Sequence, residues 1–203
     1  MRRPLLAGML LLLAGCLNLA PKPDPTRFYL LAPTVDSSRG GGLRMKGTAT
    51  IGLREVELPN YLDQSQLVTR IGPNEVKFLE TARWGEPLSA MITRVLATDL
   101  AAAAGLDEVV FHPWSRSRAP SYELRISVQR FEQDSQQVVL DAIWQARDST
   151  GTVVIPPSSA RLTEPATTSD PQAVVEAMNR ALAQLSRRIV EVVQQRRRPG
   201  TNP

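Results

Sequence analysis

The sequence contains one thiol, and the residues around it suggest a defined covalent chemistry. Cys16 is the only cysteine among the 203 residues, and two arginines and a short apolar run come before it. This order is typical of a secretory signal peptide. The segment Leu13-Ala14-Gly15-Cys16 matches the bacterial lipobox, in which the cysteine receives a diacylglycerol before cleavage. We therefore expect residues 1–15 to be a signal peptide and Cys16 to become an acylated N-terminus.

Lipidation of Cys16 would anchor the chain to a membrane. The apolar run from Leu5 to Ala14 is too short to cross a bilayer, which takes about 20 residues. One acyl chain binds a bilayer reversibly, whereas a diacylglycerol with an added palmitate would hold the protein stably. Leu17 follows the cysteine where an aspartate would favour the inner membrane, so we expect the outer membrane. The alternative is that Cys16 is an ordinary apolar residue of the signal peptide.

Residues that could support catalysis or metal binding are scarce. His112 is the only histidine, and no G-x-S-x-G segment supplies a triad serine. Zinc or iron sites built on several His or Cys ligands are excluded by composition, and the P-loop and dinucleotide-binding glycine motifs are missing from the sequence. Carboxylate-only chemistry stays open, because acidic pairs have no characteristic spacing. The candidates are Glu55, Glu57, Asp63, Glu80, Glu86 and Asp141.

We expect these carboxylates to be solvated and His112 to lie in a turn. The prediction is therefore a protein without enzyme activity, metal or cofactor. Charge gives a second exclusion, because removal of the signal peptide takes away two of the 24 basic side chains, against 20 acidic ones. A nearly neutral mature chain argues against nucleic acid as a partner.

Alternating apolar and polar residues predict about six strands that could position these side chains. The clearest alternation runs from Tyr122 to Ala146, broken by the polar residues 133–136, and it indicates a long antiparallel hairpin. A second hairpin is expected around Gly72-Pro73-Asn74. The remaining strands are expected at 28–31, 48–58 and 108–111, with the second hairpin formed by 66–72 and 75–79.

Two helices are expected, one central and one terminal. The first follows Pro87, which suits a first helical turn, and ends near Gly105. The second begins at Asp170-Pro171, an N-cap and first-turn pair. Its apolar stripe could be a coiled-coil seam, but its short length favours packing on the domain's own core. The stripe consists of Val175, Met178, Leu182, Leu185, Ile189 and Val192.

These elements predict an α/β (α+β) domain with a mainly antiparallel mixed sheet of about six strands and two long helices packed on one face. Residues 16–26 contain three closely spaced prolines and are expected to form an extended tether. Residues 27–195 should form a single periplasmic domain. Residues 196–203, which include Arg196, Arg197 and Arg198, should be a disordered basic tail.

Several segments in order resemble one family, the ABC-type transport auxiliary lipoproteins of the PqiC/YmbA type. The resemblance covers Phe28 to Trp144 and rests on short sequence motifs. Each motif is weak evidence alone, but the ordered set is specific. They are the lipobox, FYLL at 28–31, VELPNYLD at 56–63, QLVTR at 66–70, RWGEPL at 83–88, Pro113-Trp114 and LDAIW at 140–144. The part of the chain after Gly151 carries little of this pattern.

The resemblance implies a periplasm-facing, outer-membrane lipoprotein that binds an MCE-domain protein of a lipid-transport system and supports envelope integrity. It also allows self-association into a ring. A structural or assembly lipoprotein without a transport role is the alternative, and a secreted hydrolase is a third hypothesis.

The family motifs between Pro59 and Pro87 suggest an interaction surface. Their polar and aromatic residues are not required by simple core packing, so we expect them to contact the partner or a second copy. The candidates are Tyr61, Asp63, Arg70, Arg83 and Trp84. The alternative is that Asp63 and Arg70 stabilise local turns while Trp84 covers the start of its helix. Trp144, on the apolar side of its strand, is expected in the core.

Overall fold

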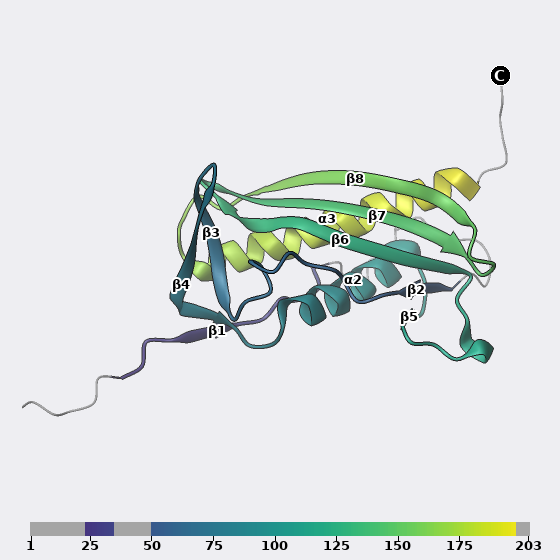
Figure 1. The fold of residues 1–203 in the computed structure, drawn as a ribbon, viewed down its shortest axis with the longest axis horizontal. Coiled ribbons are helices and arrows are strands. Elements are labelled where there is room, and N and C mark those ends of the chain that lie inside the picture. The colour runs from purple at the N-terminus through teal and green to yellow at the C-terminus, as the bar shows by residue number, and fades with distance from the viewer. Residues whose placement is uncertain (1–22, 35–49, 198–203) are drawn as a thin grey trace, which may run out of the picture.

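The structure, a computed structural model, describes residues 23–34 and 50–197. Within these ranges a curled mixed sheet is covered on one face by two helices (Figure 1). The expected signal peptide, Cys16 and most of the expected tether lie outside the described residues, as do residues 198–203. Residues 23–26, the end of the tether, have no regular secondary structure.

Three long antiparallel strands form the main part of the sheet. They are β6 Tyr122–Asp134, β7 Gln137–Asp148 and β8 Val153–Pro165. β6 and β7 meet in a tight turn in which Asp134 pairs with Gln137 and Ser135 has a φ of 59°. This pairing confirms the long hairpin that the alternation predicts.

The other edge of β6 receives two short parallel strands. β2 Ile51–Leu53 pairs near the start of β6, and β3 Gln66–Gly72 pairs near its end. The segment between them follows β6, because Glu57 forms a bridge with Ser127. This path brings the following loop, residues 59–65, next to the second half of β6.

Three further strands complete the eight-stranded sheet. β4 Glu75–Trp84 is antiparallel to β3, which confirms the second predicted hairpin. β1 Arg27–Tyr29 is parallel to β4, and β5 Val109–Phe111 is parallel to β2. The longest pairings are antiparallel and the short ones parallel, so the sheet is mixed, as predicted.

The two helices are those predicted from the sequence. α2 is Leu88–Ala104, directly after Pro87, and it ends at Gly105 in the left-handed conformation with a φ of 64°. α3 is Pro171–Arg197. The two helices pack against each other, and α3 also contacts β6, β7 and β8. Leu185 and Trp144 are both buried in the resulting core, as expected.

The strand count differs from the prediction, because β8 was not expected. Its sequence contains Pro156 and Pro157, which remove two backbone donors, and its alternation is weak. Proline is tolerated in an edge strand, and β8 pairs only with β7. Burial of Ile155 and Ala160 on one face then stabilises a strand that the local pattern does not predict.

Several element boundaries also differ. The expected strand 48–58 is reduced to β2, with residues 48–49 outside the described ranges. β4 continues through Trp84 instead of ending at Leu79. α3 continues through Arg197, so the helix includes the first two residues of the expected tail, 196–203. None of the helices in the described part of the chain is long and apolar enough to cross a membrane.

Candidate functional site

The five candidate interface residues occupy three environments. Tyr61 and Asp63 lie in the loop between β2 and β3, and Arg70 lies in β3. Arg83 and Trp84 are the last two residues of β4. The structure brings Tyr61 and Arg70 together at β6 and places the other three elsewhere.

Trp84 belongs to the core and not to an exposed surface. Only 5% of its surface is accessible, and it pairs with the equally buried Tyr29 of β1. Its backbone N–H donates to the carbonyl oxygen of Ser65 at 2.7 Å. The expectation of an exposed tryptophan anchor is therefore wrong, because β4 continues to this residue and directs the indole inward.

Asp63 and Arg83 are closer to the surface. Asp63 is exposed, and its backbone N–H donates to the carbonyl oxygen of Pro59 in the turn that begins the loop. Arg83 is half-buried, and its Nε donates to the carbonyl oxygen of Glu80 at 3.4 Å. Both side chains remain available for a partner, but neither contributes to the cluster around Arg70.

That cluster is centred on Glu132, and a β-bulge explains its position. The pairing of β6 with β7 shifts between Val128 and Arg130. Before the shift the core side chains are Leu124, Ile126 and Val128, and after it the next one is Phe131. Because the bulge inverts the alternation, Arg130 and Glu132 point to the face of the sheet opposite the helices.

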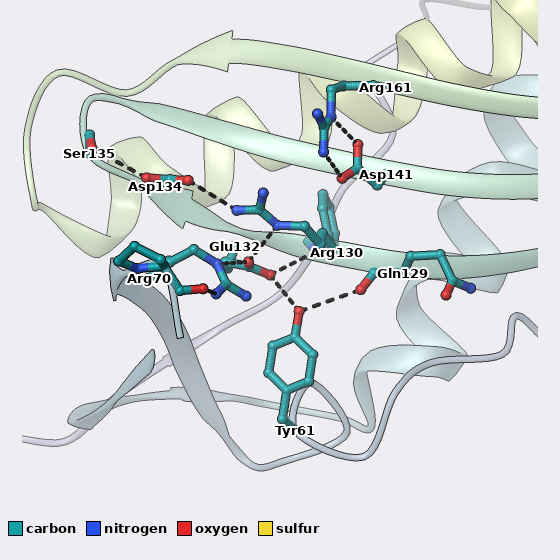
Figure 2. Close-up of polar contacts among 11 residues, drawn as sticks. Tyr61, Arg70, Gln129, Arg130, Glu132, Asp134, Ser135, Asp141 and Arg161 are labelled. Carbon is teal, nitrogen blue, oxygen red and sulfur yellow. Dashed lines mark hydrogen bonds and ion pairs between the residues drawn. The ribbon is translucent and has the colours of Figure 1, made fainter. Parts of the chain in front are cut away.

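Glu132 is fully buried on that face because other residues cover it (Figure 2). Its Oε1 accepts hydrogen bonds from Arg70 Nε at 2.9 Å and Arg130 Nε at 3.0 Å. Its Oε2 accepts from the Tyr61 hydroxyl at 2.9 Å and the Phe131 N–H at 3.0 Å. A buried carboxylate is tolerated only when it is paired and hydrogen-bonded in this way.

The cluster raises the pKa values of both Tyr61 and Arg70. Burial and the nearby Glu132 carboxylate raise the pKa of Tyr61 to about 12, so its hydroxyl stays protonated and donates a hydrogen bond to Glu132. The hydrogen bond to Glu132 raises the pKa of Arg70 above its ordinary value. Arg130 also donates to Asp134 at 3.0 Å, and Arg70 donates to the Pro73 carbonyl oxygen at 3.1 Å.

This arrangement connects three separate segments of the chain. Tyr61 comes from the loop, Arg70 from β3, and Arg130 and Glu132 from β6. Each oxygen of Glu132 already accepts two hydrogen bonds, so the carboxylate is poorly placed to exchange a proton with a substrate. The geometry favours a structural role, in which these hydrogen bonds and ion pairs hold the loop 59–65 against the sheet.

A groove lies on the same helix-free face, beside the first half of β6. Its volume is about 360 Å³, and Ile143 on its wall is 43% exposed. Its charged and polar lining includes Arg54, Glu55, Glu57, His112 and Arg125. Mixed charge beside an exposed aliphatic side chain is suited to contact with another protein.

His112 is exposed and follows β5, as expected of a turn residue. It precedes a cis peptide bond to Pro113, and its ring makes an edge contact with Trp114 at 5.1 Å between centroids. Among residues 23–34 and 50–197, no group of three or more His, Cys, Asp or Glu residues could hold a metal ion.

The carboxylates that the sequence leaves open for acid–base chemistry do not form one site. Asp141 makes a two-pronged ion pair with Arg161, both distances being 2.7 Å. Glu86 pairs with Arg94 at 2.7 Å, and Glu55 accepts a hydrogen bond from Ser89. Glu55 and Glu57 both line the groove, and Glu80 lies on β4.

Sequence reasoning missed Glu132 and Arg130. One signal was present: the apolar positions of β6 step by two up to Val128 and then by three to Phe131. Such a step indicates a bulge, and it leaves the charged residues beside Phe131 on an unexpected face. No local signal shows that Tyr61 and Arg70 meet there.

Comparisons with other proteins agree with this fold. A family model described as the ABC-type transport auxiliary lipoprotein component matches residues 29–190. The crystal structure of protein XCC0632 from Xanthomonas campestris, of family DUF330, is 18% identical and has a TM-score of 0.69. That alignment covers 84% of this chain and 96% of the Xanthomonas chain.

A second crystal structure, of an uncharacterized protein, is 16% identical with a TM-score of 0.67, covering 83% of this chain and 98% of the other. At such low identity these two likenesses show the fold alone. No curated protein sequence matches the chain significantly.

Proposed function

The chain belongs to the family of ABC-type transport auxiliary lipoprotein components, and we propose that it is the outer-membrane-anchored subunit of an intermembrane lipid-transport system. In this role the lipid on Cys16 holds the domain at the outer membrane, facing the periplasm. The domain binds a periplasm-spanning MCE-domain partner, and the complex supports envelope integrity.

The observation that carries this proposal is the extent of the family match. The matched residues, 29–190, include all eight strands except the first two residues of β1. The lipobox at Cys16 lies outside this match and supports the membrane anchor independently.

We place the partner contact on the helix-free face that carries the groove. Ile143 is exposed there between charged residues, whereas the opposite face of the sheet is covered by α2 and α3. Both oxygens of Glu132 are occupied by hydrogen bonds that keep the neighbouring loop in one position. This supports a role in binding and not in catalysis. Self-association into a ring is compatible with the same surface.

The test is capture of the MCE-domain partner by the acylated full-length protein, extracted from membranes in mild detergent. Ile143→Arg should reduce capture strongly, because it places a charge in the centre of the proposed contact. Val153→Arg is the matched control, since Val153 is 42% exposed on β8. It should leave capture unchanged.

The size-exclusion mass of both variants reports on self-association. If neither the parent nor the control captures an MCE-domain protein, the transport proposal fails and the structural or assembly role becomes the better explanation. Equal capture by Ile143→Arg and the parent would exclude the groove as the contact.

A further inference from the structure

The first strand and the residue that follows it present two large apolar side chains to solvent. β1 and the residues after it alternate, so Tyr29 and Leu31 are 6% and 4% exposed, while Phe28 and Leu30 are 67% and 53% exposed. Tyr29 and Leu31 belong to the core. Phe28 and Leu30 therefore contribute little to folding, and their apolar character needs another explanation.

The position of this pair is fixed by its neighbours. Leu30 lies against Gly85, where an added Cβ would come within 2.9 Å of Leu30 Cδ2. Phe28 lies opposite Arg83 in the pairing of β1 with β4. The guanidinium of Arg27 stacks on the Tyr29 ring at 5.5 Å from its centroid. Arg83 thus lies beside Phe28 on the outward face, whereas Arg27 lies with Tyr29 on the other face of the strand.

The pair also lies close to the expected lipid anchor along the chain. Phe28 comes twelve positions after Cys16, and a fully extended segment of that length reaches at most about 40 Å. α3, with its 27 residues, is itself about 40 Å long. β1 lies at one end of the long axis of the molecule, and β5 lies toward the other end (Figure 1).

We propose that the outward face of residues 28–30, formed by Phe28 and Leu30 with Arg83 beside Phe28, inserts into the surface of the bilayer that holds the Cys16 lipid. This inference rests on the proposed lipid anchor. Aromatic and aliphatic side chains partition into the interfacial region of a bilayer, and arginine pairs with its phosphate groups. The contact sets the orientation of the domain, so that the helix-free face is presented to the periplasm at a fixed angle.

The experiment uses the acylated full-length protein with Phe28→Cys. Lipidation consumes the thiol of Cys16, so the introduced thiol is the only one that reacts with a polarity-sensitive fluorophore. The labelled protein is reconstituted into vesicles of phosphatidylethanolamine and phosphatidylglycerol. Phe111→Cys is the matched control, because Phe111 is also a strand phenylalanine, 49% exposed, on β5.

The label at position 28 should emit at shorter wavelength in vesicles than in detergent and be quenched by nitroxide-labelled lipid. Its quenching by aqueous iodide should be several-fold weaker than that of the label at position 111. Equal iodide quenching at the two positions would overturn the inference. Protection of position 28 in detergent, without quenching by nitroxide lipid, would also overturn it, by indicating a contact with a second copy.

Failure of the anchor gives a different result. If the protein does not float with the vesicles, the lipidation of Cys16 is wrong and the proposed function fails with it. If it floats but position 28 stays accessible to iodide, the anchor stands and only the membrane contact of β1 is wrong.

Discussion

Arg70 Nε and Glu132 Oε1 lie 2.9 Å apart although 62 residues separate them in the sequence. The Glu132 side chain is fully buried, and that of Arg70 is 18% exposed. This ion pair forms where β3 joins the end of β6, and Tyr61 completes it from the neighbouring loop. It therefore connects the family motifs around Tyr61 and Arg70 to β6, in the centre of the sheet.

Replacement of Glu132 by glutamine should destabilise the fold. The variant keeps the size of the side chain but leaves Arg70 and Arg130 without a buried negative partner, and breaking such a pair costs about 3–5 kcal/mol. Chemical denaturation measures the free energy of unfolding. Glu80→Gln, on the exposed side of β4, is the control and should change it by less than about 0.5 kcal/mol. Similar values for both variants would contradict the role of Glu132.

The stability of the parent protein should fall between pH 10 and pH 12 in a way that depends on Tyr61. The pKa of Tyr61 is raised from 10.0 to about 12 in the folded state, so this contribution is complete below pH 10 and is lost as the pH rises toward 12. Denaturation midpoints for the parent and Tyr61→Phe measure the difference. The variant should show a smaller fall, and parallel pH profiles would show that Tyr61 titrates normally.

Trp84→Ala should destabilise the domain and not merely weaken association. Removing a buried tryptophan costs about 3–5 kcal/mol through lost contacts and a cavity. Arg83→Ala, at the half-buried neighbouring position, should cost much less. Thermal unfolding followed by circular dichroism distinguishes the two. An unchanged melting temperature for Trp84→Ala would show that the indole does not pack in the core.

Leu185→Asp tests the stripe of α3. Leu185 is fully buried, and an unpaired charge there should cost several kcal/mol or prevent folding. Arg187→Asp, two residues further along the exposed side of the helix, should cost about 0.5 kcal/mol from helix propensity. Equal melting temperatures for Leu185→Asp and the parent would show that this stripe faces solvent or a partner instead of the core.

Cys16→Ser should abolish lipidation, because the chain has no other thiol. The variant should appear in the soluble periplasmic fraction or retain its signal peptide. Fractionation after a high-salt wash and intact-protein mass spectrometry measure both outcomes. If the variant stays in the membrane fraction without its signal peptide, another feature anchors the protein.

The local signals in the sequence were sufficient for both helices, for seven of the eight strands and for the class of fold. The spacing of apolar residues in α2 and α3 and the turns of both hairpins depend on neighbours within a few positions. Pro87, Gly105 and Asp170-Pro171 mark the helix boundaries correctly for the same reason. The short family motifs were sufficient to identify the family, although the contacts of their residues could not be predicted.

Tertiary structure decided the rest, because it depends on pairings across long stretches of chain. β8 becomes a strand only because β7 offers an edge and α3 covers its apolar face. Trp84 is buried because β1, far before it in the sequence, pairs with the end of β4. Glu132 is tolerated inside the protein because a bulge, a loop and a parallel strand bring Tyr61, Arg70 and Arg130 to it. A buried charge is stable only with its partners in place, and no spacing within the sequence specifies partners that meet through the sheet.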